Sequence, residues 1–295
     1  MNIRRFVSHV FFALLLSIAG GWNVTSQAQT TELVQMSAGS TAKIEAMLKA
    51  ASTASGSTVS RLAAASALLD GAVFARTAAA DADLQPMRVN LDTMDNLELV
   101  EYSLAAARAS LQPQAAVRDF CDELRKIRYR RGDNNGFAAR LRYASDWIAD
   151  NAYRSNVREI TFDLPGTVYA TRTLDYITCH RDLFPALADS AAFERMQALE
   201  MGYRLHRFPY MKKESVGKKQ VVELLSDGDI FFVVPRSSDF DWSDAGIARI
   251  IDSKVYLIHG DEHSGRIRLD KVPLSELLRL HAKELSGYRV LRAKD

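Results

Sequence analysis

The stretch Ile230-Phe231-Phe232-Val233-Val234 is a continuous apolar run that follows the turn signal Asp227-Gly228-Asp229. A short apolar run bounded by turn residues is typical of a strand that is buried on both faces. Further apolar segments of strand length follow at residues 247–251, 255–258, 267–269 and 288–291. Asp252-Ser253-Lys254 has the composition of a hairpin turn, so we expect an antiparallel sheet in this part of the chain.

The chain before Ser226 has helical rather than strand character. Asp95 and Glu98 have the spacing of a capping box, which marks the start of a helix, and Pro113 closes that segment. Apolar spacing predicts helices over residues 41–80 (in two parts), 95–111, 114–127 and 137–151. Because helices come first and strands follow, the pattern predicts an α+β fold rather than an alternating α/β fold.

The N-terminus has the features of a secretory signal peptide. Arg4 and Arg5 precede a largely apolar stretch, and Ser26-Gln27-Ala28 offers small residues at the positions that a signal peptidase reads. The apolar run is too short for a final membrane anchor, although a single N-terminal anchor is the alternative interpretation. We therefore expect a periplasmic or secreted protein with no stable membrane span after processing. The predicted organisation is a signal peptide at 1–28, a flexible linker at 29–40 and a single domain at 41–295.

The charge balance excludes some partners. The chain carries 38 Lys and Arg residues and 36 Asp and Glu residues. Removal of residues 1–28 would take away two arginines and no acidic residue, which leaves 36 of each. A balanced surface gives no argument for binding nucleic acid or anionic lipid.

Two cysteines, Cys121 and Cys179, are present in the whole chain. An exported protein could pair them in a disulfide. Cys121 lies in a segment with an amphipathic helical pattern, which instead favours a small buried thiol. The sequence leaves the redox state of the two cysteines open.

Eight short segments, spread in a shared order from about Ser57 to Arg292, match signatures of one enzyme family. They are residues 89–95, 127–132, 140–148, 176–180, 208–211, 227–230, 245–248 and 257–259. The chain resembles the NlpC-type, papain-like cysteine amidases of bacterial cell walls, in particular the N-acetylmuramoyl-L-alanine amidase group known as domain of unknown function 1460. The resemblance implies a papain-like α+β fold in which a helical N-terminal portion packs on an antiparallel sheet of five or six strands.

The resemblance also implies the catalytic positions. In these amidases a thiolate at a helix start attacks the amide, a histidine on a facing strand is the base, and a third polar group orients the histidine. Here Asn96 occupies the nucleophile position, Asp244 the base position and His259 the orienting position. A carboxamide cannot act as the nucleophile at neutral pH. The protein is therefore expected to be an inactive relative, although residual activity stays open.

Several further residues are placed at the pocket by the same resemblance. The expected ligand-binding residues are Asp95, Phe74, Arg128, Arg142, Tyr143, His180 and Tyr210. Phe74 and Arg142 depart from the family pattern, in which a tyrosine and a histidine stand at these places, so substrate preference is open as well. No cofactor is expected.

Two other groups of residues could supply catalysis. His259, Asp261 and His263 would share one face of an extended segment and could hold Zn²⁺, whereas the simpler interpretation is an orienting histidine followed by a polar turn. Cys121 or Cys179 could act as a relocated nucleophile. Neither idea has a precedent in the family pattern.

Three hypotheses about function follow. The first is a non-catalytic relative that binds a peptidoglycan fragment or a cell-wall protein. The second is an active amidase that uses a metal or a relocated nucleophile. The third is a partner-binding protein whose groove has closed, which a bulky side chain such as Phe74 or Trp242 in the cleft would favour.

Overall fold

A computed structural model describes residues 34–54, 56–76, 86–236 and 240–295. The predicted signal peptide at 1–28 and the first part of the predicted linker, 29–33, lie outside these residues. Within the described ranges, none of the helices combines the length and the apolar character that crossing a bilayer requires.

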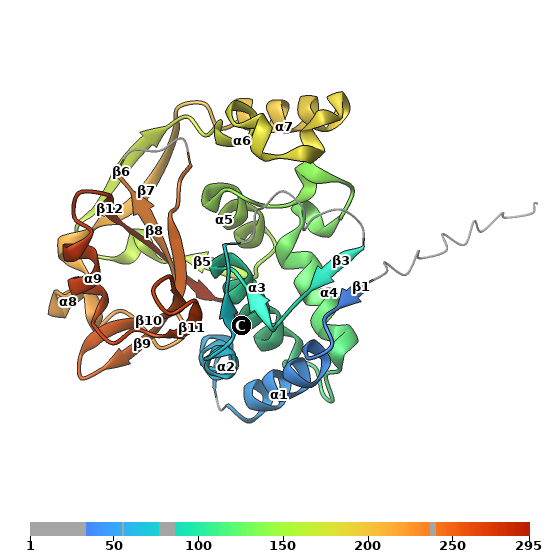
Figure 1. The fold of residues 1–295 in the computed structure, drawn as a ribbon. Coiled ribbons are helices and arrows are strands. Elements are labelled where there is room, and N and C mark those ends of the chain that lie inside the picture. Colours follow the sequence, from blue (N-terminus) through green and yellow to red (C-terminus); the bar gives the residue numbers. More distant parts are fainter. Residues whose placement is uncertain (1–33, 55, 77–85, 237–239) are drawn as a thin grey trace, which may run out of the picture. The chain divides into compact units, whose positions relative to one another are not determined.

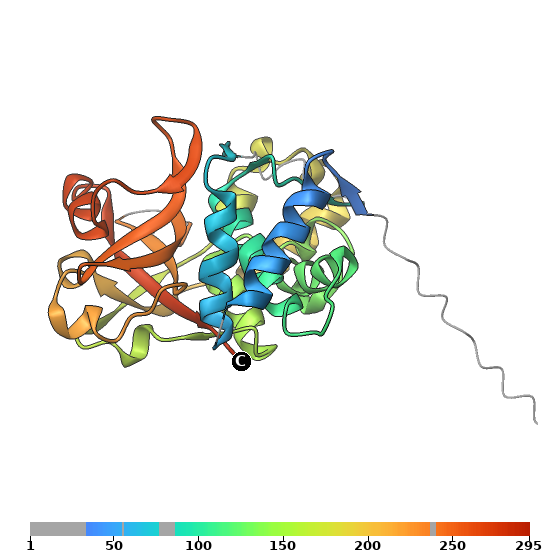
Figure 2. The same ribbon diagram turned by 90° about the horizontal axis from the view of Figure 1, so that it is seen from below.

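The helical part is built around α3. The first four helices are α1 (Ser40–Thr53), α2 (Thr58–Ser66), α3 (Asn96–Ala109) and α4 (Val117–Arg128). All residues of α3 except Arg108 are buried, which is the pattern of a helix enclosed on every side. It lies between α4 and the sheet in Figure 1, and α1 and α2 lie side by side next to it in Figure 2.

The main sheet of the described residues has ten strands. In spatial order they are β4 (Thr93–Met94), β2 (Val73–Phe74), β11 (Arg266–Leu269), β10 (Lys254–Asp261), β9 (Asp244–Ile251), β8 (Ile230–Pro235), β12 (Leu285–Ala293), β7 (His206–Lys212) and β6 (Thr167–Arg172), and β5 (Val157–Glu159) pairs with β12. The pairs are antiparallel except β2–β4, which is parallel. The α+β class is thus confirmed.

The expected number of five or six strands is wrong. The strands β8 to β12 lie where the sequence predicts them, and Asp252 and Ser253 have the positive φ values of a tight hairpin turn. The prediction missed β6 and β7 because β7 contains Pro209 and β6 has no continuous apolar run. These two strands are stabilised by pairing with each other, with Tyr169 opposite Pro209, and the local sequence pattern does not reveal this pairing.

The second half of the predicted flexible linker is also ordered. Residues Val34–Met36 form β1, which pairs in parallel with β3 (Met87–Val89) in a separate two-stranded sheet. Ser37 donates a hydrogen bond of 2.7 Å to Asp92 Oδ2. A partner distant in the sequence fixes this polar segment, so the linker prediction is wrong for residues 34–40.

The helix predicted over 137–151 is shorter than expected. A 3₁₀ turn at Phe137–Ala139 is followed by an extended link, and α5 spans Ala144–Tyr153. The carboxylate of the buried Asp241 accepts hydrogen bonds from the N–H groups of Ala144 (2.8 Å) and Ser145 (2.6 Å). A distant aspartate therefore caps α5, and local sequence gives no sign of it.

Four more α-helices follow along the described chain: α6 (Tyr176–Cys179), α7 (Ser190–Met201), α8 (Lys219–Val222) and α9 (Leu274–Leu280). Side chains of β8 alternate between two apolar clusters. Phe232 belongs to the cluster with α3, whereas Phe231 and Val233 belong to the cluster with α9. The apolar run at residues 230–234 is thus buried on both faces of the sheet.

A buried ionic cluster joins α3 to the segment after α4. Glu101 is fully buried on α3 and accepts hydrogen bonds from Arg128 Nε at 2.9 Å and from both terminal nitrogens of Arg140. Arg128 also donates to the carbonyl of Arg88 at 2.8 Å. The Glu101 carboxylate thus faces two buried guanidinium groups, and Arg128 has a second, longer ion pair with Glu98 at 3.9 Å.

We predict that Glu101→Gln lowers the free energy of unfolding by about 3–5 kcal/mol, because it removes the carboxylate that both buried arginines bind. Urea denaturation measures this change. Glu223→Gln is the control, since the one side-chain partner of Glu223 among the described residues is Lys219, in an exposed pair whose loss should change little. Equal stability of the Glu101 variant and the wild type would contradict the structural role.

Candidate functional site

The candidate site lies where the N-terminus of α3 meets β9 and β10. Asp95 caps α3: its carboxylate accepts from the N–H of Glu98 at 2.8 Å, and Glu98 Oε2 accepts from the N–H of Asp95 at 3.1 Å. This reciprocal pair is the capping box that the spacing predicted. It fixes the start of the helix, so that Asn96 becomes its first residue.

Both ends of the Asn96 carboxamide are bound to the sheet. Its Oδ1 accepts a hydrogen bond from the N–H of Gly260 on β10 at 2.6 Å, and its Nδ2 donates to Asp244 Oδ1 on β9. The orientation of the amide is determined, because the N–H of Gly260 can only donate and a carboxylate can only accept. Asn96 is only 7% exposed.

Asp244 extends the contact to His259. Its Oδ1 also accepts from the N–H of Ala245 at 2.7 Å, and its Oδ2 lies 2.9 Å from Nδ1 of His259. On the other side of the ring, His259 Nε2 lies 2.8 Å from Asp270 Oδ1. The four side chains Asn96, Asp244, His259 and Asp270 therefore form one hydrogen-bonded chain, which we call the Asn–Asp–His–Asp chain.

The two carboxylates determine the charge of His259. Burial opposes the charged ring, but the attraction of Asp244 and its hydrogen bond, with those of Asp270, outweigh burial and hold the pKa of His259 well above its ordinary value. Because each ring nitrogen faces a carboxylate oxygen, both donate. A protonated imidazole has no lone pair with which to accept a proton, so this ring cannot act as a general base while it stays in the chain.

Sequence reasoning missed two members of this arrangement, Asp270 and Gly260. Asp270 directly follows the predicted strand at 267–269, and antiparallel pairing of that strand with the one containing His259 could have placed it nearby. The role of Gly260 is steric, because a Cβ at this position would overlap the ring of Phe74. Phe74, on β2, thus lies against the backbone whose N–H binds Asn96.

Trp242 lies two residues before Asp244. Its indole N–H donates to the carbonyl of Arg142 at 2.9 Å, and its ring packs edge-on against Phe232 at 5.9 Å. Phe74 and Trp242 are the two bulky side chains for which the sequence suggested a place in the cleft. Phe74 covers the backbone at Gly260, and Trp242 is held by its contacts with Arg142 and Phe232.

Three of the expected ligand-binding residues are buried and bound to other protein groups. Arg128 belongs to the ionic cluster with Glu101. The guanidinium of Arg142 lies over the ring of Phe137 and donates to its carbonyl at 2.6 Å. The hydroxyl of Tyr143 donates to Glu200 Oε1 at 2.6 Å. Burial and these contacts give each of them a structural explanation.

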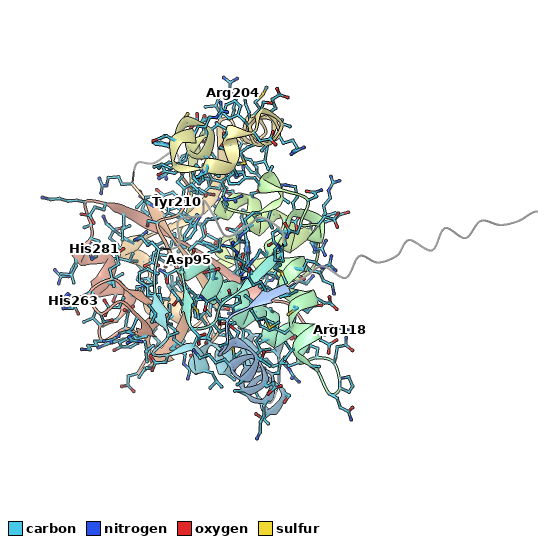
Figure 3. The ribbon with its side chains drawn as sticks, turned by 45° about the vertical axis from the view of Figure 1, so that its right-hand side comes forward. Asp95, Arg118, Arg204, Tyr210, His263 and His281 are labelled. Atoms are coloured by element: carbon cyan, nitrogen blue, oxygen red, sulfur yellow. The ribbon has the colours of Figure 1, made fainter. Side chains whose placement is uncertain are left out.

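The remaining expected contacts are partly exposed. His180 stacks on Tyr176 with ring centres 4.1 Å apart, and Tyr176 packs on Phe240 at 5.5 Å. Phe240 in turn packs on Trp242 at 5.7 Å. A row of aromatic rings therefore leads from His180 to Trp242, two residues before Asp244. Tyr210 lies on β7 and is labelled in Figure 3 together with Asp95.

The alternative catalytic groups are not assembled beside Asn96. Strand β10 ends at Asp261, and the N–H of Gly265 closes a turn onto the carbonyl of Asp261 at 2.9 Å, so His263 leaves the strand face. Among the described residues, no three His, Cys, Asp or Glu side chains are grouped to hold a metal ion.

The cysteines lie on two different helices. Cys121 is buried on α4, as the helical pattern predicted, and burial raises the pKa of its thiol to about 11. It therefore stays protonated at neutral pH and is a poor nucleophile. Cys179 is exposed at the end of α6.

A pH titration of stability tests the charge of His259. Below about pH 6.5 the His259 ring is protonated in both the folded and the unfolded state, so its contribution to the free energy of unfolding is fully present. Above that pH the unfolded chain loses the proton first, and the free energy of unfolding should fall by up to about 1.4 kcal/mol per pH unit. Urea denaturation from pH 7.5 to 9 measures this slope. Burial raises the pKa of Glu98 to about 7, so this pH range lies above the titration of that carboxyl group.

His259→Gln should flatten that slope, whereas His281→Gln should keep it, because the His281 side chain is exposed and pairs only with Glu284. If the His259 variant and the wild type show the same dependence on pH, the charged ring is excluded.

A family model and solved structures both relate this chain to N-acetylmuramoyl-L-alanine amidases. A family model described as AmiA-like, N-acetylmuramoyl-L-alanine amidase-like, matches residues 71–283. A crystal structure of an N-acetylmuramoyl-L-alanine amidase from Bacteroides uniformis is 27% identical, with a TM-score of 0.69, over 77% of this chain and 95% of that chain. A Bacteroides fragilis protein described as a putative xylanase is also 27% identical, with a TM-score of 0.69, over 76% and 96% of the two chains.

A Legionella pneumophila protein assigned to domain of unknown function 1460 shares the fold at 16% identity, with a TM-score of 0.67, over 86% of this chain and 94% of its own. No curated protein matches the sequence. Since the family model covers most of the chain, and the solved relatives share its helices and its mostly antiparallel sheet, the protein belongs to the AmiA-like, N-acetylmuramoyl-L-alanine amidase-like family.

Proposed function

We propose that this protein is an exported, non-catalytic member of its family that binds a peptidoglycan fragment without cleaving it. The observation that carries this proposal is the Asn96 carboxamide, which is bound at Oδ1 by Gly260 and at Nδ2 by Asp244. The family match supports a cell-wall role. The composition of residues 1–28 supports export to the periplasm or beyond.

Amide hydrolysis of the cysteine type needs two groups at this place. One is a nucleophile with a removable proton at the helix start, where the helix dipole lowers a thiol pKa, and the other is a base with a free lone pair. Asn96 supplies no such nucleophile. We propose that it replaces the catalytic cysteine of NlpC-type, papain-like amidases, and that Asp244 replaces their histidine.

The present side chains are well suited to holding the site together. Asp244 accepts from Asn96, Ala245 and His259, and His259 is held between two carboxylates. Exchange of a reactive group for groups that satisfy one another can stabilise a fold while activity is lost. The Asp244 side chain is still 23% exposed, so part of it is open to a ligand.

A closed groove that binds a protein partner is the second candidate. The observation that favours it is the position of Phe74, whose ring lies against Gly260 beside Asn96. A ring at this place narrows access to the carboxamide. The two candidates differ in whether a muropeptide reaches Asp244.

The first experiment tests catalysis. Purified wild-type protein is incubated with defined muropeptides and followed by mass spectrometry, beside Asn96→Cys/Asp244→His and the matched variant Asn96→Ala/Asp244→His. We expect the wild type and the alanine variant to be inert. The cysteine variant should cleave the bond between muramic acid and L-alanine, because it restores a thiol at a helix N-terminus next to an imidazole.

Cleavage by the wild type would contradict the proposal. Loss of that cleavage with a chelator would then indicate a metal, and loss after thiol alkylation would indicate Cys121 or Cys179. Inertness of all three proteins would favour the closed groove.

The second experiment tests binding. Isothermal titration with a muramyl peptide should show association with the wild type that Phe74→Ala strengthens, because a smaller side chain opens the way to Asp244. Val73→Ala is a matched control. Val73 is the neighbour of Phe74 on the same strand and its side chain is exposed, so this variant should bind the muramyl peptide like the wild type. No heat with either the wild type or Phe74→Ala would exclude a muropeptide as the ligand of this site.

A further inference from the structure

A cavity lies away from the Asn–Asp–His–Asp chain, between the loop after α4 and helix α7. Its volume is about 610 Å³. Three arginines, Arg130, Arg131 and Arg195, line it together with small apolar side chains that include Ala138, Ala198 and Leu199. Neither the family match nor the proposed function assigns any role to this cavity.

The arginines differ in what they already bind. Arg130 is held by Asp146 through both terminal nitrogens, one of them at 2.6 Å, and Tyr203 donates to the same carboxylate at 2.9 Å. Its charge is thereby neutralised and its place is fixed. Arg131 and Arg195 are exposed, and within the described part of the chain their guanidinium groups have neither an ion pair nor a hydrogen bond.

The backbone around the cavity is built in an unusual way. Arg131 has a φ of +55°, which is the left-handed region that side chains other than glycine rarely adopt. Its N–H is tied to Asp150 Oδ1 at 3.0 Å, which holds this conformation. Gly136 has a φ of +117°, and the guanidinium of Arg195 on α7 lies 4.0 Å from where a Cβ would stand. Strained residues of this kind cluster where a ligand is held.

The charges define the ligand. With Arg130 neutralised, Arg131 and Arg195 contribute two positive charges to the lining and Asp133 contributes one negative charge, so the cavity matches a single anionic group. Guanidinium groups bind planar carboxylates through paired hydrogen bonds. Beside the ring of Tyr203, the alanines of the lining give apolar surface that small aliphatic side chains can contact.

We propose that this cavity is a binding site for the carboxylate end of a short peptide with small aliphatic side chains. The guanidinium groups of Arg131 and Arg195 bind the carboxylate, and the lining alanines contact the methyl groups. Asp133 lowers the net positive charge of the lining, which weakens its attraction for doubly charged groups such as phosphate monoesters. The site does not depend on Asn96, so it stands whether or not the proposed function holds.

The test uses the full chain and N-acetyl-alanyl-alanine as the probe, with its C-terminal amide as the uncharged comparison. Isothermal titration should show binding of the acid and at least tenfold weaker binding of the amide. Arg131→Gln and Arg195→Gln should each weaken binding of the acid about tenfold, because each removes a charge-assisted hydrogen bond. Arg118→Gln is the matched control, an exposed arginine near the start of α4 that does not line the cavity (Figure 3).

Two further variants sharpen the result. Asp133→Asn should strengthen binding of the acid a few-fold, because it removes the one negative charge of the lining. Arg131→Gly should raise the melting temperature by relieving the left-handed strain, and at the same time weaken binding. Gain of stability with loss of binding is the combination that a purely structural arginine would not give.

Several outcomes would overturn the proposal. They are equal binding of the acid and the amide, binding that both arginine substitutions leave unchanged, and tighter binding of inorganic phosphate than of the peptide acid. The muropeptide test on the Asn96 site has a separate readout, because substitutions at Arg131 and Arg195 should leave the response to Asn96→Cys/Asp244→His unaltered.

Discussion

The carboxylate of Asp244 is held between two partners that come from different elements of the fold. Asn96 reaches it from the first turn of the buried helix α3, and His259 reaches it from the neighbouring strand β10. Asp270 holds the far side of the same ring, so a negative, a positive and a negative group alternate in a mostly buried place. Removal of His259 would leave two carboxylates facing each other without their shared positive partner, which is costly away from water. Asp244 therefore links the first turn of α3 to the sheet through hydrogen bonds.

Under the proposed function, these contacts explain how a family architecture can persist without its catalytic chemistry. A nucleophile and a base are useful because each is incompletely satisfied in the resting enzyme. Here the carboxamide of Asn96, the carboxylate of Asp244 and the ring of His259 use their hydrogen-bonding groups on one another. The same junction of helix start and strands then contributes to stability. The cavity beside Arg131 and Arg195 shows the opposite character, with exposed charge and strained backbone.

The sequence predicted the parts of the fold that depend on local pattern. The capping box at Asp95 and Glu98, the buried strand β8 and the hairpin at Asp252 are each encoded by neighbouring residues, and each is present. The strands β6 and β7 and the ordered segment β1 were missed because their partners lie far away in the sequence. Juxtaposition of Asn96 and Asp244 could be inferred only through the family resemblance, and the burial of Arg128, Arg142 and Tyr143 depends on distant partners that no local signal reveals.

The most direct test of this account is the protonation state of the His259 ring, read from the nitrogen chemical shifts of the imidazole by NMR spectroscopy at pH 7.5. A doubly protonated ring, with both nitrogens as donors, is the expected result, because Asp244 and Asp270 each accept one of its hydrogens. A neutral ring with one unprotonated nitrogen at this pH would contradict the account. It would mean that His259 has a lone pair to offer and that the Asn–Asp–His–Asp chain is not the closed structural link described above.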